Sequence, residues 1–194
     1  MPTRIGLLGG TFDPVHNGHL SIANSFLKSG KIDQLWVLLT PDPPHKTGQD
    51  RTVFELRLHM LTAAFDGMDK VRVMTIENEL PKPSYTYRTI TYLKRLYPEK
   101  EYFLCIGGDS FVNFHIWKDY ESILKEVRLL VANRPGENFA AIQSEILDRS
   151  LIVDHELVPD SSTEIKERVK KGDSIKTLVP ESVERIITEK GLYK

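Results

Sequence analysis

Short apolar runs alternate with longer stretches of helical periodicity along most of the chain. Leu20, Ala23 and Leu27 fall on one face of a helix, whereas the run "KVRVMTI" alternates apolar and polar positions as a strand does. This pattern predicts strands at 4–9, 34–40 and 70–76, within 101–108 and 127–136, and more weakly at 151–155. It predicts helices at 17–29, from Val53 to Ala64, around Ile90 and Leu93 up to Pro98, from about Ser161 onward, and after Pro180.

Strands separated by helical stretches are typical of βαβ units, which build a mostly parallel sheet with helices on both faces. The sequence therefore predicts an α/β, Rossmann-like, doubly wound fold. The chain has 194 residues and no repeat, low-complexity tract or linker, which favours a single domain over 1–194. Ligands bind beyond the carboxyl ends of the strands in such sheets, so the site should lie in the loops that follow them. These loops are 9–19, 40–52, 107–118, 133–137 and 156–163.

Composition and charge narrow the class of ligand. The formal net charge of −1 gives no overall attraction to nucleic acid or to an anionic membrane, so an anionic ligand must be held by a local site. The single cysteine, Cys105, cannot form an internal disulfide and lies in an apolar run, which predicts an inert buried thiol. Because no apolar stretch approaches the length of a membrane span and no signal-like segment opens the chain, we expect a cytoplasmic protein.

The segment "GGTFDPVHNGHL" at 9–20 carries the clearest chemistry. Gly9 and Gly10 allow a ligand to approach the backbone closely, and the helix that begins near Asn17 offers unpaired N–H groups to an anion such as phosphate. His16 and His19 flank the first turn of that helix and can donate hydrogen bonds to phosphate oxygens. Neither the G-x-x-x-x-G-K-[ST] loop nor the G-x-G-x-x-G turn is present after this strand, which argues against a P-loop protein and a dinucleotide oxidoreductase.

Two other interpretations of this segment stay open at this point. The glycines and one histidine could form an ordinary turn with a helix cap. Asp13, His16 and His19 could instead form a three-ligand metal set. The turn interpretation leaves the second histidine and the extra glycines unexplained, and no further carboxylate or cysteine cluster supports the metal interpretation.

The run "GTFDPVHNGH" resembles the G-x-F-D-P-x-H-x-G-H motif of the nucleotidylyltransferase superfamily, whose H-x-G-H histidines also occur in class I aminoacyl-tRNA synthetases. Within that superfamily the chain is similar to the bacterial nicotinate mononucleotide adenylyltransferases over almost its whole length. The ordered set of matching features is "PPHK" at 43–46, Arg57, "PSYT" at 83–86, "GGDS" at 107–110, Trp117, "NRPG" at 133–136 and "SSTEIK" at 161–166.

The resemblance implies adenylyl transfer from ATP to nicotinate mononucleotide, with Mg²⁺ entering bound to ATP and no protein metal cage. It implies the catalytic residues His16, His19 and Lys46. It implies that the acceptor is bound by Lys46, Arg57, Thr86, Trp117 and Lys118. It implies that ATP is bound by Gly9, Gly10, Thr11, Phe12, His16, Gly18, His19, Gly107, Asp109, Ser110, Asn133, Arg134, Ser161, Ser162, Thr163 and Lys166.

Several of these residues have a plainer alternative on sequence alone. Lys46 could be a solvated surface lysine, Arg57 could form a surface ion pair, and Trp117 could be a core residue. Ser161 and Glu164 fit a helix capping box as well as a phosphate cradle. Lys166 stands where the family has arginine; it keeps the charge and loses the planar bidentate fork.

Two other functions remain open for the whole chain. One is a sister transferase with a different phosphate acceptor, nicotinamide mononucleotide included, and the other is a non-catalytic nucleotide sensor. The expected partners are small nucleotides, without nucleic acid or membrane, and self-association into a homo-oligomer is left open.

Overall fold

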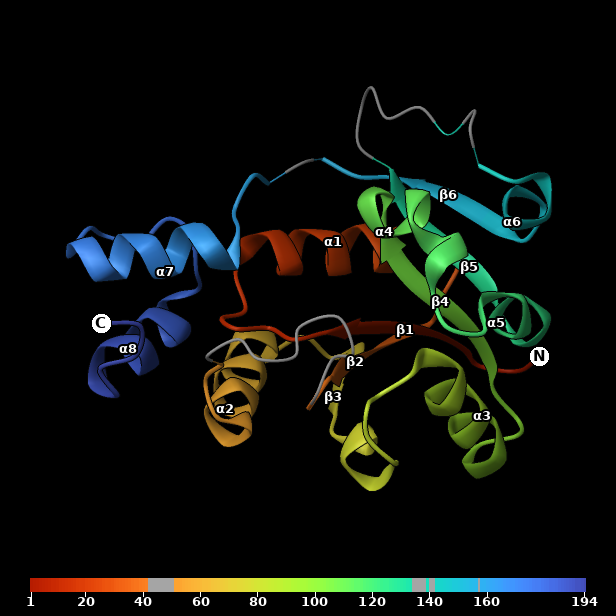
Figure 1. The fold of residues 1–194 in the computed structure, drawn as a ribbon, viewed down its shortest axis with the longest axis horizontal. Helices are drawn as coiled ribbons and strands as arrows, with labels where there is room; N and C mark the ends of the chain where they lie inside the picture. Colours follow the sequence, from red (N-terminus) through yellow and green to blue (C-terminus); the bar gives the residue numbers. More distant parts are fainter. Residues whose placement is uncertain (42–50, 134–138, 140–141, 157) are drawn as a thin grey trace.

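A computed structural model describes residues 1–41, 51–133, 139, 142–156 and 158–194. In these residues six strands form one sheet in the order β3-β2-β1-β4-β5-β6, and every neighbouring pair is parallel (Figure 1). The strands are β1 (Arg4–Gly10), β2 (Gln34–Leu39), β3 (Val71–Met74), β4 (Glu101–Gly107), β5 (Arg128–Asn133) and β6 (Ser150–Asp154). The predicted α/β fold with a parallel, Rossmann-like sheet is confirmed.

Helices fill the connections between the strands. The long predicted helices are present as α1 (Asn17–Lys28), α2 (Phe54–Phe65), α3 (Thr86–Leu96), α7 (Ser162–Lys171) and α8 (Glu181–Glu189). The periodicity did not predict three short helices and two 3-10 turns, because each covers seven residues or fewer: α4 (Gly108–Val112), α5 (Tyr120–Glu126), α6 (Ser144–Asp148), η1 (Ile76–Glu79) and η2 (Phe114–Ile116). None of the described helices is long and apolar enough to span a membrane.

The sheet separates two apolar cores, because successive strand side chains point to opposite faces. Leu8 of β1 packs in the core that also holds Phe26 of α1, together with residues of α2, α7 and α8. Its neighbour Leu7 packs in the core that holds Leu93 of α3, together with residues of α4, α5 and α6. Full burial of a side chain such as Phe26 contributes about 1.5–3 kcal/mol, so both layers fix the sheet firmly.

The sheet topology places a crevice at the carboxyl ends of β1 and β4. The chain runs outward from β1 through β2 to β3, then returns to β4 on the other side of β1 and runs outward again to β6. Loops that leave β1 and β4 therefore diverge to opposite faces of the sheet, which is where doubly wound sheets bind ligands. Helices α7 and α8 lie together with the C-terminus at one end of the molecule, and the N-terminus lies at the opposite end (Figure 1).

Candidate active site

The turn between β1 and α1 brings the two predicted histidines together. His16 is the N-cap residue of α1, and His19 lies in the first turn of that helix. Their ring centroids are 3.8 Å apart, and the backbone N–H of His16 donates to Nδ1 of His19 at 3.2 Å. Because Nδ1 of His19 accepts this bond, the N–H of the neutral ring lies on Nε2.

Small and aromatic neighbours fix this pair. A Cβ on Gly18 would lie 3.0 Å from Nδ1 of His16 and 3.3 Å from the carbonyl oxygen of Val158, so a larger residue would displace the ring. Phe12 adopts a positive φ of 47° and packs edge-on against His19, with ring centroids 4.9 Å apart. A Cβ on Gly10 would lie 2.7 Å from the Phe12 ring. Gly10 and Gly18 are therefore required by the packing of Phe12 and of His16.

The His16 ring is buried and neutral at physiological pH. Its side chain is among the buried polar groups, with the residue 8% exposed, and burial lowers its pKa from 6.5 to about 4. Its Nδ1 has no hydrogen-bond partner among the described residues. A neutral imidazole carries one N–H, so His16 can donate one hydrogen bond.

A cavity of about 220 Å³ opens beside this turn, at the crevice between β1 and β4. Predicted acceptor-binding residues from separate loops line it, and predicted ATP-binding residues share the same wall. A Cβ on Gly9 would meet nothing within 4 Å, so the backbone there faces open space. The predicted residues that line the cavity are Gly9, Gly10, Thr11, Thr86, Gly107, Ser110, Trp117 and Lys118.

The same cavity contains a buried acid that sequence reasoning missed. Glu77 is 6% exposed, and its Oε1 accepts a hydrogen bond from the Thr89 hydroxyl at 3.0 Å. Burial raises the pKa of Glu77 above its ordinary value, against the opposing effect of the hydrogen bond from Thr89. Its Oε2 and the hydroxyl of Ser84 have no partner among the described residues. The only sequence signal was the position of Glu77, shortly before the "PSYT" motif.

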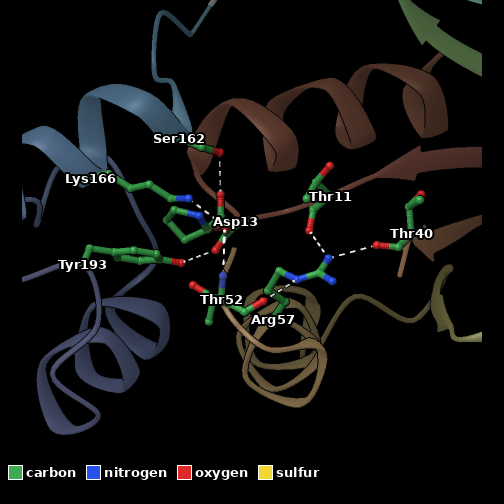
Figure 2. Close-up of polar contacts among 9 residues, drawn as sticks. Thr11, Asp13, Thr40, Thr52, Arg57, Ser162, Lys166 and Tyr193 are labelled. Carbon is green, nitrogen blue, oxygen red and sulfur yellow. Dashed lines mark hydrogen bonds and ion pairs between the residues drawn. The ribbon is translucent and has the colours of Figure 1, made fainter. Parts of the chain in front are cut away.

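Lys166 does not extend freely from α7, because it forms an ion pair with Asp13 of the β1–α1 turn. The distance from its Nζ to Asp13 Oδ2 is 2.6 Å (Figure 2). The Tyr193 hydroxyl donates to Oδ1 at 2.7 Å, and the N–H of Thr52 donates to Oδ2 at 3.3 Å. Burial alone would raise the pKa of Asp13, but these donors outweigh it and hold that pKa below its usual range. Asp13 is therefore ionised and buried, and its carboxylate links Thr52, Lys166 and Tyr193 to the β1–α1 turn.

The described residues do not support Asp13, His16 and His19 as a metal set. They contain no group of three His, Cys, Asp or Glu side chains that could hold a metal ion. The Asp13 carboxylate is instead occupied by an ammonium, a phenol and a backbone N–H.

Arg57 is buried rather than exposed in a surface ion pair, the alternative considered above. It is 2% exposed, and its guanidinium donates to backbone carbonyls of three segments (Figure 2). The acceptors are Thr11 at 2.8 Å, Thr40 at 3.0 Å, Pro41 at 3.3 Å and Thr52 at 3.0 Å. This arrangement ties the loops after β1 and β2 to the start of α2, and direct contact of Arg57 with the acceptor stays a prediction.

The N-terminus of α7 lies against the same turn. Ser161 is its N-cap, and its hydroxyl oxygen accepts from the N–H of Glu164 at 3.1 Å. The Glu164 carboxylate accepts from Arg168 at 3.0 Å instead of returning to Ser161, so only half of the predicted capping box forms. Ser162 donates its hydroxyl to the carbonyl oxygen of Pro14 at 2.9 Å, and this bond ties the helix to the histidine turn (Figure 2).

The remaining predicted residues are spread along the same edge of the sheet. Asp109 is the second residue of the short α4 after β4, and Thr163 lies in the first turn of α7. Asn133 ends β5 with its side-chain oxygen buried and without a partner among the described residues. Lys46 and Arg134 lie outside the described residues.

Comparison with known proteins gives the family. A model of the cytidylyltransferase-like family matches residues 7–168. A relative from Exiguobacterium sibiricum is 40% identical over 190 residues, covering 98% of each chain, and one from Clostridium tetani is 34% identical over 195 residues, covering 97% of this chain and 98% of its own. Both relatives are named "Probable nicotinate-nucleotide adenylyltransferase". The chain belongs to this adenylyltransferase family.

Solved structures agree with the family's fold. A Plasmodium falciparum nicotinic acid mononucleotide adenylyltransferase complexed with NaAD superimposes with a TM-score of 0.81 at 19% identity, covering 98% of this chain and 97% of its own. The same protein complexed with APC gives a TM-score of 0.80. At this identity the likeness bears on the fold alone. The cavity between β1 and β4 and the adjoining histidine turn form the candidate active site of this family member.

Proposed function

We propose that the chain transfers the adenylyl group of ATP to nicotinate mononucleotide, giving nicotinate adenine dinucleotide and pyrophosphate in the synthesis of NAD. The observation that carries this proposal is one crevice in which an acceptor cavity adjoins the histidine turn. Thr86, Trp117 and Lys118 line the cavity together with Gly9 and the other residues of the β1 end. The proposed acceptor site and the proposed triphosphate site thus adjoin each other at the carboxyl end of β1.

The reaction needs no protein nucleophile. A 5′-phosphate oxygen of the mononucleotide attacks the α-phosphorus, the bond to the bridging oxygen breaks, and its electron pair leaves with pyrophosphate. A phosphate monoester has its second pKa near ~6, so the attacking group is already an anion at neutral pH. Burial raises the pKa of the Cys105 thiol, which fits an inert core residue. Catalysis then consists of in-line positioning and stabilisation of developing negative charge.

We assign the triphosphate to the turn that joins β1 to α1. His16 and His19 each offer an N–H, and the first turn of α1 adds backbone N–H groups and the positive end of the helix dipole. His19, with its Nδ1 engaged by the His16 backbone, donates from Nε2 to the oxygens of the leaving pyrophosphate. Mg²⁺ would enter as MgATP, bound mainly through phosphate oxygens and water.

We assign the pyridine ring to the face of Trp117. A pyridinium is flat and cationic, and the face of a tryptophan ring attracts such a group. Thr86 is the first residue of α3, so its backbone N–H is one of the first-turn donors that lack a partner within the helix. This N–H and that of Lys118 would bind the ring carboxylate, which distinguishes nicotinate from nicotinamide by charge.

Release of pyrophosphate tests the proposal. The protein is incubated with MgATP and one acceptor at a time: nicotinate mononucleotide, nicotinamide mononucleotide, phosphopantetheine or none. We expect rapid release with nicotinate mononucleotide and formation of the dinucleotide by mass spectrometry. Faster release with another acceptor would assign the chain to a sister transferase. No release with any acceptor would favour a nucleotide sensor and overturn the proposed reaction.

A further inference from the structure

The Asp13 carboxylate joins four segments that are distant in the sequence. It is 5% exposed and receives hydrogen bonds from Thr52 before α2, from Lys166 in α7 and from Tyr193 in the C-terminal tail (Figure 2). Asp13 itself lies in the turn that carries His16 and His19. Through these hydrogen bonds the carboxylate holds α7 and the C-terminal tail against the histidine turn.

We propose that Tyr193 is a positioning residue of the ATP site: its hydroxyl fixes the Asp13 carboxylate, and Asp13 in turn holds Lys166 beside the histidine turn. This inference rests on the proposed function, because it takes the triphosphate to lie between that turn and the start of α7. Tyr193 itself would not touch either substrate.

Tyr193 contacts both members of the ion pair. Its hydroxyl is 2.7 Å from Asp13 Oδ1, and the Nζ of Lys166 lies 5.1 Å from the centroid of its ring. Burial raises the pKa of the Tyr193 phenol far above its usual value, so the phenol keeps its proton and donates to Asp13. The N–H of Leu192 bonds to the carbonyl oxygen of Ile187 at 3.0 Å, which anchors the tail to the end of α8.

The geometry leaves Lys166 able to act on a second anion. Its side chain is 29% exposed, whereas the Asp13 side chain is 5% exposed, so the ammonium is the outward-facing member of the pair. An ammonium has three donors, and Asp13 takes one of them. Asp13 thus orients Lys166 while accepting only one of the three hydrogen bonds that its ammonium can donate. The bond from Ser162 to Pro14 fixes the helix that carries Lys166 at a second point.

Removing the Tyr193 hydroxyl should therefore weaken ATP binding and spare the acceptor. In Tyr193→Phe the ring stays beside Lys166, but Oδ1 of Asp13 loses its donor and the carboxylate is held through Oδ2 alone. We expect the dissociation constant of a non-hydrolysable ATP analogue, measured by calorimetry, to rise about five- to tenfold, since a hydrogen bond to a charged group is lost. The dissociation constant of nicotinate mononucleotide should change by less than about twofold, because its proposed cavity does not include Asp13 or Lys166.

A double-mutant cycle shows whether Tyr193 acts through Lys166. Lys166→Gln alone should weaken binding of the ATP analogue, and adding Tyr193→Phe to it should weaken binding by less than about twofold further, because residues in one network do not act additively. Tyr92→Phe is the matched control: Tyr92 donates to Glu79 at 2.9 Å on the surface, so the same atom is removed from a similar bond away from the site. It should leave both dissociation constants within about twofold of wild type.

Three outcomes would overturn the inference: unchanged ATP binding in a folded Tyr193→Phe protein, equal weakening for ATP and the mononucleotide, or full additivity with Lys166→Gln. If Tyr193→Phe does not fold by circular dichroism, the cycle of Asp13→Asn with Lys166→Gln decides, with the same expected non-additivity. Failure of the proposed function is a separate result, namely a wild-type protein that binds the ATP analogue but releases no pyrophosphate with any acceptor.

Discussion

Acidification should destabilise the protein through His16. The folded state holds this buried ring with a pKa of about 4, against 6.5 for an exposed histidine. Between these values the unfolded chain binds a proton that the folded chain does not, so stability is fully present above pH 6.5 and falls as pH drops toward 4. Each pKa unit corresponds to about 1.4 kcal/mol, so the whole effect is about 3 kcal/mol, of which about 2 kcal/mol is lost by pH 5.

Urea unfolding of wild type and His16→Gln at pH 7.5 and pH 5 isolates this contribution. Asp13 also favours folding less at low pH, because its folded pKa is lowered, but that effect is common to both proteins. We expect the free energy of unfolding of wild type to fall by about 2 kcal/mol more than that of His16→Gln. His59→Gln removes an exposed ring from α2, and its free energy of unfolding should fall by the same amount as that of wild type. Equal losses in wild type and His16→Gln would refute the assignment of a buried, neutral His16.

Three further substitutions separate the parts of the site. His19→Ala should lower kcat by about two to three powers of ten at an almost unchanged free energy of unfolding, because it removes one transition-state donor; near-normal turnover would contradict that role. Arg57→Lys should lower the free energy of unfolding by about 2–4 kcal/mol in urea titrations, since one ammonium cannot reach four carbonyls, whereas the exposed Arg95→Lys should cost less than about 0.5 kcal/mol. Trp117→Leu should raise the KM for nicotinate mononucleotide by about tenfold and leave that for ATP unchanged; an equal rise in both would argue against ring stacking.

The sequence was sufficient for the parallel sheet because each strand is a short apolar run and each long helix repeats its apolar positions. The short helices escaped prediction for the opposite reason: α4 has five residues, which is too few to display a helical period. The order of the strands also follows from connection rules only in part. Which strand lies beside β1 after β3 depends on how α3 crosses the sheet, and no local pattern in the sequence records that crossing.

The motifs predict a site at one edge of the sheet, but they do not predict the hydrogen-bond partners of each side chain. The Arg57 guanidinium is held by backbone carbonyl oxygens, which leave no trace in the sequence, and its contact with the acceptor stays a prediction. Tyr193 is distant from Asp13 by 180 residues along the chain and carries no motif of its own. Glu77 is an ordinary glutamate in the sequence, and only its burial beside Thr89 makes it unusual.

Buried polar atoms without partners provide an independent argument for the location of the site. Among the described residues these atoms are His16 Nδ1, Glu77 Oε2, Ser84 Oγ, Asn133 Oδ1 and Asp160 Oδ2. Leaving such an atom unpaired costs about 1–3 kcal/mol, so folded proteins satisfy nearly all of them with protein, ligand or water. Glu77 and Ser84 line the cavity, His16 and Asn133 are predicted ligand contacts, and Asp160 precedes the N-cap of α7. These unpaired groups lie where several loops converge and are not scattered through both cores. Such clustering is expected of a binding surface whose missing hydrogen-bond partners are supplied by the substrate.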